Sequence, residues 1–531
     1  MAIRNLYAGA ALLFSLFGAA SLNAQPASDV LTWHNDHNRS GANNAESTLT
    51  LTNVNSATFG KVGFFSTDGV VDAEPLYVGG LTIGGATHNV VFIATEHDTV
   101  YADDAVTGTV LWKTSLLKSG ETTVSYPQCD EIQPEIGITA TPVIDLTEGP
   151  NGAIYLVNMS VDASGTYHHR LNALDITTGG QLFGGPQEIA ATYPGNGPNS
   201  KGGLLHFFAE HVLEHAALVD WNGGIYLAWT SHCDIAPYSS WVMGYDAATL
   251  KQTSVLNLTP NGTKGGIWMS GAGMATTPTE ILFLDGNGTF DTTLDSNGLP
   301  ASGDYGNAFL ELGIGSNGQL QVKDYYATDN TTAQSAADVD LGAGGAMILP
   351  AYTDASGNTQ WLAVGAGKDH NIYVVQRNNM GKYHPNGGYI YQTLTGALPS
   401  GEWGAPAFWN NTVYYGGRQD SIKAFAVKDA LLVATPTSET TNTFPYPGTT
   451  PSISSKGSSY AIVWAVSHMK TGVPDVLYAY NASNLAEELY DSNQAGTRDQ
   501  FGSVQHFITP MIANGRVYVG TNTGVAVFGL L

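Results

Sequence analysis

Three basic residues stand at similar positions along a chain that carries few basic residues. Lys368, Arg418 and Lys470 each lie in a polar turn between apolar runs, whereas the whole chain has 20 Lys and Arg against 45 Asp and Glu. An arginine can hold a carboxylate through two parallel hydrogen bonds. If the three turns meet in space, they form a positive patch for a ligand with several carboxylates. The alternative is that each pairs with an aspartate of its own turn, such as Asp369 or Asp420.

Histidines and carboxylates in similar turns and loops are candidates for acid–base chemistry. Such a group can accept the proton of a hydroxyl, the step that alcohol oxidation requires, or act in a sugar lyase or hydrolase. The candidates for this catalytic role are His97, His232, His468, His506, Glu135 and Glu402. Hard cations such as calcium prefer oxygen ligands. The candidates for a metal site are Asp72, Asp98 and Asp369, and for all of these residues the alternative is an ordinary hydrogen-bonded polar group.

Two tryptophans lie in glycine-rich segments that leave room for a flat ligand. Trp268 stands in GGIWMSGAG and Trp403 in SGEWGAPA. Their rings would stack on a quinone or a sugar, or else fill the core of the fold. No G-x-S-x-G, H-E-x-x-H, P-loop or dinucleotide fingerprint occurs, so the enzyme classes that depend on these motifs have no support.

A repeated unit must position these residues. An apolar strand, a polar turn and the phrase Y/F-A-x-D/N-A-x-T-G recur in eight units, most clearly in Val90 to Lys113. Their spacing of roughly 50 to 80 residues is in the range of propellers and arrays. Each unit contains about four short strands, and the first often carries a proline, which suits an edge position. The sequence therefore predicts an all-β, eight-bladed β-propeller of four-stranded antiparallel blades, with seven blades as the alternative.

Two pairings are expected within this fold. The last unit lacks its outer strand, and the segment FGKVGFF, from Phe59 to Phe65, can supply it and remove an exposed strand edge. Cys129 lies in the loop that leads into the second unit, and Cys233 lies in a turn of the third. Both kinds of loop emerge on the same face of a propeller. An oxidising compartment therefore favours a disulfide between them, with two free buried thiols as the alternative.

The N-terminus has the features of a secretory signal. Arg4 precedes an apolar stretch from Ala8 to Ala20, and small residues precede Gln25. No later apolar run reaches the length of a membrane span. We therefore expect a protein secreted to the periplasm or the exterior after cleavage near Ala24.

The rest of the chain is expected to form one large domain. We assign residues 1–24 to the signal peptide, 25–58 to an N-terminal extension and 59–531 to a single propeller. The formal net charge of −25 argues against nucleic acid as a partner, because nucleic acid binding depends on cationic side chains. The chain is expected to act as a monomer on a small-molecule alcohol or sugar, or on a glycan.

Two segments carry a resemblance to a known family. YADDAVTGTVLW, from Tyr101 to Trp112, and LDITTG, from Leu174 to Gly179, resemble the PQQ-like repeat. This repeat occurs in pyrroloquinoline-quinone-dependent alcohol dehydrogenases and in related non-catalytic assembly scaffolds. The resemblance implies an eight-bladed propeller, with PQQ and calcium as cofactors. Neither the adjacent cysteine pair of many such enzymes nor a C-x-x-C-H haem motif is present.

Three functional classes follow from these observations. The first is a quinone-dependent oxidoreductase in which Lys368, Arg418, Lys470, Trp268 and Trp403 hold the cofactor. The second is a propeller that binds or cleaves polysaccharide without a redox cofactor. The third is a non-catalytic interaction scaffold. The resemblance and the three basic turns favour the first.

Overall fold

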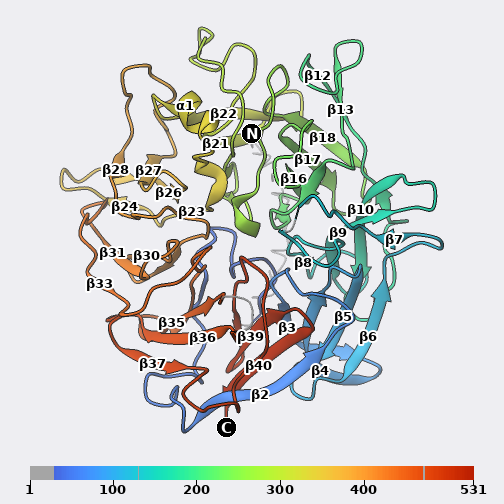
Figure 1. The fold of residues 1–531 in the computed structure, drawn as a ribbon, viewed down its shortest axis with the longest axis vertical. Coiled ribbons are helices and arrows are strands. Elements are labelled where there is room, and N and C mark those ends of the chain that lie inside the picture. Colours follow the sequence, from blue (N-terminus) through green and yellow to red (C-terminus); the bar gives the residue numbers. More distant parts are fainter. Residues whose placement is uncertain (1–28, 130, 470–472) are drawn as a thin grey trace, which may run out of the picture.

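A computed structural model describes residues 29–129, 131–469 and 473–531. Within these residues the strands form eight antiparallel blades around a central axis, following one another in sequence order (Figure 1). The predicted eight-bladed β-propeller is therefore confirmed, and the seven-bladed alternative is wrong. The expected signal peptide and Lys470 lie outside the described residues.

The first four blades each place their strands side by side, in order from the channel outward. Blade 1 consists of β3 (Leu76–Ile83), β4 (Ala86–Ala94), β5 (Thr99–Asp104) and β6 (Val110–Ser115). Blade 2 consists of β8 (Val143–Asp145), β9 (Ala153–Val161), β10 (Tyr167–Asp175) and β11 (Gln187–Glu188), with β7 (Thr122–Thr123) also paired to β9. Blade 3 consists of β14 (Val212–Glu214) and β15 (Val219–Trp221), then β16 (Gly224–Ser231), β17 (Trp241–Asp246) and β18 (Gln252–Asn257). Blade 4 consists of β19 (Ala275–Thr276), β20 (Ile281–Leu284), β21 (Phe309–Ile314) and β22 (Leu320–Tyr326).

The remaining four blades repeat this plan. Blade 5 consists of β23 (Ala346–Ile348), β26 (Leu362–Ala366), β27 (Ile372–Gln376) and β28 (Gln392–Leu394). Blade 6 consists of β29 (Ala407–Trp409), β30 (Thr412–Tyr415), β31 (Lys423–Lys428), β32 (Leu431–Leu432) and β33 (Ser438–Glu439). Blade 7 consists of β34 (Ser452–Lys456), β35 (Ser459–Ser467), β36 (Val476–Asn481) and β37 (Glu488–Asp491). Blade 8 consists of β38 (Met511–Ala513), β39 (Arg516–Thr521), β40 (Gly524–Leu530) and β2 (Phe59–Ser66).

A few short elements lie outside the blades. They are the hairpins β12 (Thr192–Pro194) with β13 (Leu204–His206) and β24 (Tyr352–Thr353) with β25 (Thr359–Gln360), helix α1 (Thr331–Ala336) and the 3₁₀ turns η1 (Met269–Gly271) and η2 (Leu341–Ala343). Strand β1 (Ala42–Asn43) instead joins blade 7, where it pairs in parallel with β34 at the inner edge. None of the helices in the described part of the chain is long and apolar enough to cross a bilayer.

Apolar strands form the blades because each sheet buries both of its faces against its neighbours. In β9 the run from Ala153 to Ser160 is buried without interruption, as expected for a central strand covered on both sides. Trp112 illustrates the contact between blades: its indole N–H donates to the carbonyl of Ile176 in blade 2 at 3.0 Å. A side chain at Gly179 would collide with this indole, and Gly179 also has a φ of +68°, so the glycine of the repeat phrase is required there.

The two ends of the propeller close the ring as predicted. Strand β2 pairs with β40 in antiparallel register, from Phe59 opposite Leu530 to Ser66 opposite Gly524. The prolines are also placed largely as expected, because β3, β8, β29, β34 and β38 each begin one residue after a proline. In blades 4 and 5, however, Pro278 and Pro350 follow the innermost strand.

The segment from Val30 to Asn43 runs inside the channel, along the inner edges of the blades (Figure 1, dark blue near the centre). Its backbone bonds to the innermost strands in turn: Val30 with Tyr77, Leu31 with Ile144, His37 with Thr276, Asn38 with Ile348, Ser40 with Phe408 and Gly41 with Ile453. Trp33 packs against blade 3 and the Asn43 side chain bonds the carbonyl of Ile512 in blade 8. The segment thus satisfies inner strand edges that would otherwise lack partners.

Candidate functional site

A hollow of about 150 Å³ lies at the mouth of the channel. It is formed by turns between the second and third strands of blades and by loops that lead from one blade to the next, which emerge on the same face. Its lining residues include Cys233, Trp268, Asn287, Asp340, Lys368, Trp403 and Tyr446. Trp268, Trp403 and Lys368 therefore line the same hollow, as we expected from their equivalent positions in the repeat.

Aromatic rings and imidazoles form a continuous chain around this mouth. Trp268 contacts Phe507 edge-on, with ring centroids 4.8 Å apart, and His506 follows at 5.7 Å from Phe507. His506 in turn contacts Tyr446 at 5.3 Å, and Tyr446 contacts Trp403 at 6.0 Å. Rigid aromatic walls of this kind suit a flat ligand, because they offer large apolar faces at a small cost in side-chain entropy.

The basic residues of the mouth differ in their partners. The Lys368 ammonium lies 2.7 Å from Asp340 and 3.0 Å from Asp338, so the pairing alternative is correct for this residue, although with other aspartates than expected. Arg418 stacks on the rings of Trp403 and Tyr446, at 5.2 and 5.7 Å from their centroids. No carboxylate of the described residues lies within ion-pair distance of Arg418.

Asp420 is not the partner of Arg418, because it pairs with Lys423 of its own blade. The Nε of Arg418 is buried and has no hydrogen-bond partner among the described residues. A buried guanidinium N–H without an acceptor is costly, so this side chain is prepared for an anionic ligand.

Oxygen atoms beside Lys368 offer a place for a hard cation. The Asn287 backbone N–H donates to Asp340 at 2.6 Å, and the Asn287 side-chain amide donates to Asp338 at 2.6 Å. The amide oxygen of Asn287 is left buried without a partner in the described part of the chain. Burial raises the pKa of Asp340, and Lys368 opposes this shift. An unpartnered amide oxygen next to a carboxylate is the donor type that Ca²⁺ and related cations prefer.

The predicted disulfide is confirmed. Cys129 and Cys233 are bonded, with their Cα atoms 5.5 Å apart. The bond ties the loop that leads into blade 2 to a turn of blade 3, and Cys233 lines the hollow. The disulfide therefore fixes one wall of the site.

Three of the predicted catalytic residues lie away from this hollow. His97 and Glu135 face each other, with the imidazole Nδ1 3.0 Å from both carboxylate oxygens. His232 is buried against Tyr126, with ring centroids 4.5 Å apart, and burial lowers the pKa of His232 to about 3. His97 and Glu135 form a pair of their own, while His232 is a neutral buried ring.

The three predicted metal ligands do not come together. Asp72 contacts Glu96, and burial raises the pKa values of both carboxyls. Asp98 is buried beside Asn158, whereas Asp369 in blade 5 accepts hydrogen bonds from its own turn. Among the described residues, no group of these aspartates lies close enough to share one ion. Asp72 and Asp98 lie in the entry loop and a turn of blade 1, whereas Asp369 lies in a turn of blade 5.

Glu402 lies beneath the mouth, in a fully buried position. One of its carboxyl oxygens accepts the N–H of Gly404 at 2.7 Å, and burial raises its pKa from 4.5 to about 8. Between these values the folded protein holds a proton that the unfolded chain has lost, so this group makes the protein less stable as pH rises from 4.5 to 8.

We therefore expect the free energy of unfolding of Glu402→Gln to fall less steeply than that of the native protein between pH 4.5 and pH 8. The difference in slope between the two proteins should not exceed about 1.4 kcal/mol per pH unit, the limit for one proton. Thermal unfolding temperatures of both proteins, measured at intervals of about one pH unit across this range, report the effect. Parallel curves would show that Glu402 ionises normally in the folded state.

Some residues of the site carried no distinguishing mark in the sequence. Asn287 and Asp340 stand in turns and loops of the correct face, but polar residues of the same types occur in every blade. Their role depends on the hydrogen bond between the Asn287 backbone N–H and Asp340, two residues that lie 53 positions apart in the chain. Only the meeting of two blades reveals it.

Solved structures share this architecture. A quinohemoprotein alcohol dehydrogenase from Comamonas testosteroni superposes with a TM-score of 0.60 at 13% identity, covering 96% of this chain and 81% of that one. One from Pseudomonas putida HK5 has a TM-score of 0.59 at 13% identity, covering 95% and 80%. A europium-containing methanol dehydrogenase has a TM-score of 0.59 at 11% identity, covering 95% and 98%.

At the level of sequence the result is different. No protein-family profile and no curated protein matches the chain. The superpositions show that the chain has the eight-bladed fold of the PQQ-dependent alcohol and methanol dehydrogenases, as its resemblance to their repeat predicted.

Proposed function

We propose that this protein is a quinone-dependent oxidoreductase that oxidises a hydroxyl group. The observation that carries this proposal is Arg418, a guanidinium stacked on two aromatic rings at the channel mouth with no carboxylate partner in the described residues. PQQ is flat and carries three carboxylates, so it fits a site that combines aromatic walls with a cation that has no counter-ion.

The residues of the hollow, and Arg418 behind its walls Trp403 and Tyr446, would divide the work of binding. Arg418 would hold a carboxylate of the quinone, while Trp268 and Trp403 would flank its rings. Lys368 adds positive charge, but Asp338 and Asp340 already neutralise it. A divalent or trivalent cation bound to the free oxygen of Asn287 would compete with Lys368 for the carboxylate of Asp340.

The bound quinone would supply the two-electron acceptor that alcohol oxidation needs, a chemistry that no side chain provides. The protein would position the cofactor and keep water from it. The disulfide wall at Cys233 and the aromatic chain serve this purpose because both are rigid. The disulfide also supports our proposal that the protein works in an oxidising compartment after secretion.

Reconstitution tests the proposal. Purified protein is mixed with PQQ and either Ca²⁺ or a lanthanide, and we expect quenching of tryptophan fluorescence, a changed quinone absorbance and reduction of dichloroindophenol by an added alcohol. Absence of binding with both metals would refute the proposal. Depolymerisation of a glycan without any electron acceptor would instead support a polysaccharide-cleaving propeller.

A further inference from the structure

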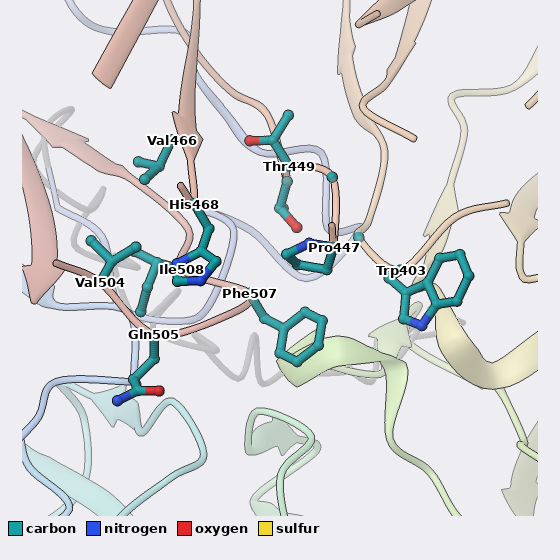
Figure 2. A pocket seen from close by; sticks show the side chains of 12 residues that line it. Trp403, Pro447, Thr449, Val466, His468, Val504, Gln505, Phe507 and Ile508 are labelled. Atoms are coloured by element: carbon teal, nitrogen blue, oxygen red, sulfur yellow. The ribbon is translucent and has the colours of Figure 1, made fainter. Parts of the chain in front are cut away.

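A cavity of about 20 Å³ lies in the channel, and Trp33 of the segment inside the channel forms part of its wall. Glu131 lines both this cavity and the hollow at the mouth. Phe507 lies between the cavity and a smaller hollow of about 10 Å³ beside Trp403, where His468 is placed (Figure 2). A volume of about 20 Å³ holds one water molecule or one ion, so the cavity excludes organic ligands.

Two buried carboxyl groups meet beside this cavity. Asp72 lines the cavity, and its carboxyl group contacts that of Glu96, which is 0% exposed. Oε2 of Glu96 accepts the N–H of Gly137 at 2.7 Å and the hydroxyl of Thr139 at 3.1 Å. Oε1 of Glu96 and Oδ2 of Asp72 are buried and meet no donor in the described part of the chain. Because carboxylates are acceptors only, a proton or a cation must lie between the two groups.

No lysine or arginine balances this pair. The ion pairs that these side chains form within residues 29–129, 131–469 and 473–531 involve neither Asp72 nor Glu96. Burial raises the pKa of Asp72 to about 6, and burial together with the charge of Asp72 raises the pKa of Glu96 well above its usual range. The other titratable groups that line the cavity are Glu74, Glu131, His215 and His506.

A buried charge therefore remains at neutral pH. Glu96 keeps a proton, while Asp72 is ionised and has no lysine or arginine partner among the described residues. An isolated buried carboxylate is costly, and a bound cation would remove this cost.

We propose that Asp72 and Glu96 bind one Ca²⁺ ion, or a hard cation of similar size, at the edge of this cavity. The two carboxylates balance the charge of the ion, and Thr139 and Thr141 add hydroxyl oxygens in the cavity wall. Mg²⁺ fits less well, because it keeps several of its waters and the cavity has room for about one. Binding displaces the proton of Glu96, so about one proton leaves for each ion bound at pH 7.

The ion would strengthen the ring near its closure. Asp72 follows Val71, whose backbone N–H donates to the carbonyl of Thr521 in blade 8 at 3.0 Å. Glu96 lies in the turn between β4 and β5 of blade 1, and its partner Gly137 lies in the loop that leads into blade 2. One ion therefore connects three neighbouring blades at the place where the two ends of the propeller meet.

This site is separate from the oxygen atoms at the mouth. Asn287 lies in blade 4 and Asp340 in the loop that leads into blade 5, whereas Asp72 and Glu96 belong to blade 1. The inference does not depend on the quinone, and its tests use protein without PQQ.

Calorimetry with Ca²⁺ tests the proposal. Protein freed of metal ions by a chelator is titrated with CaCl₂ at pH 7 in buffers that differ in their heat of protonation. We expect binding of one ion with release of about one proton. CaCl₂ at about 100 times its Kd should raise the unfolding temperature by about 2 to 3 °C. If no ion binds with release of a proton, the two carboxyls hold a shared proton only and the inference is wrong.

Replacement of Glu96 by glutamine tests the ligand. The amide can donate to Asp72 and still accept from Gly137, so the variant should fold without metal. Its affinity for Ca²⁺ should fall at least about 10-fold, and the release of a proton should disappear. Glu311→Gln is the matched control, because Glu311 is also buried with one oxygen that lacks a partner among the described residues. Undiminished affinity in Glu96→Gln, or equal losses in both variants, would overturn the inference.

Terbium luminescence tests the location of the ion. Tb³⁺ takes the same oxygen ligands as Ca²⁺ and emits when a nearby tryptophan is excited, so Trp33 in the cavity wall should sensitise it. Trp33→Phe should remove most of the emission, whereas Trp268→Phe should not. Emission that depends on Trp268, or Ca²⁺ binding lost in Asp340→Asn but kept in Glu96→Gln, would place the ion at the mouth and refute the channel site.

Discussion

Replacing Arg418 by alanine is expected to weaken PQQ binding about 30- to 500-fold. This range corresponds to a loss of about 2 to 3.7 kcal/mol, within the usual effect of removing one partner of a buried charge pair. The effect should be large because the described residues offer Arg418 no other carboxylate, so its full charge is available to the ligand. Titration of tryptophan fluorescence with PQQ measures the change in Kd.

Two further variants distinguish a specific contact from a general loss of charge. Arg418→Lys keeps the charge but loses the planar fork, so its affinity should fall between those of the alanine variant and the native protein. Arg377→Ala is the matched control, because Arg377 also stacks on a tryptophan, Trp361, but is paired with Glu280. Equal losses in Arg418→Ala and Arg377→Ala would mean that net charge, not the site, governs binding.

Replacing Arg39 by methionine is expected to lower the free energy of unfolding by about 3 to 5 kcal/mol, the range for breaking a buried charged network. Arg39 lies in the channel segment and is 0% exposed. Its guanidinium donates to the carbonyls of Met274 and Trp33, each at 2.9 Å, and to the hydroxyl of Thr32 at 2.7 Å. Burial lowers its pKa to about 10, so the charge persists at neutral pH.

Thermal and denaturant-induced unfolding measure this loss. Lys113→Met is the control, because Lys113 is exposed and rests on Tyr101 at the surface, and it should change stability by less than about 0.5 kcal/mol. A native-like stability of Arg39→Met would show that the channel segment contributes little to holding the blades together.

Much of the fold was predictable because each blade is a local structure. Four neighbouring strands pair in sequence order, so the apolar runs and turns of one unit contain most of the information for that unit. The closure by Phe59–Ser66 was also predictable, since an eighth unit without an outer strand needs one. The bond between Cys129 and Cys233 followed from the loops in which they lie.

The path of residues 30–43 was not predictable from its sequence. This segment has no strand periodicity, because its backbone bonds go to many separate strands and to tight turns within the segment, such as that from His34 to Gly41. A similar reason hid the contact of Asp475 with the backbone N–H of Val504, which forms only when a turn of blade 7 and the loop before blade 8 come together.

The sequence by itself determined the eight blades, the closed ring and the face on which Trp268, Trp403, Lys368 and Arg418 gather, because the repeat fixes where each turn emerges. Only the tertiary structure decided which of the two basic side chains is paired with carboxylates and which has no carboxylate partner among the described residues. Asp338 and Asp340 pair with Lys368, and Arg418 stacks on aromatic rings instead. Charge pairing depends on distances of a few ångströms between blades, and a spacing in sequence does not set these distances.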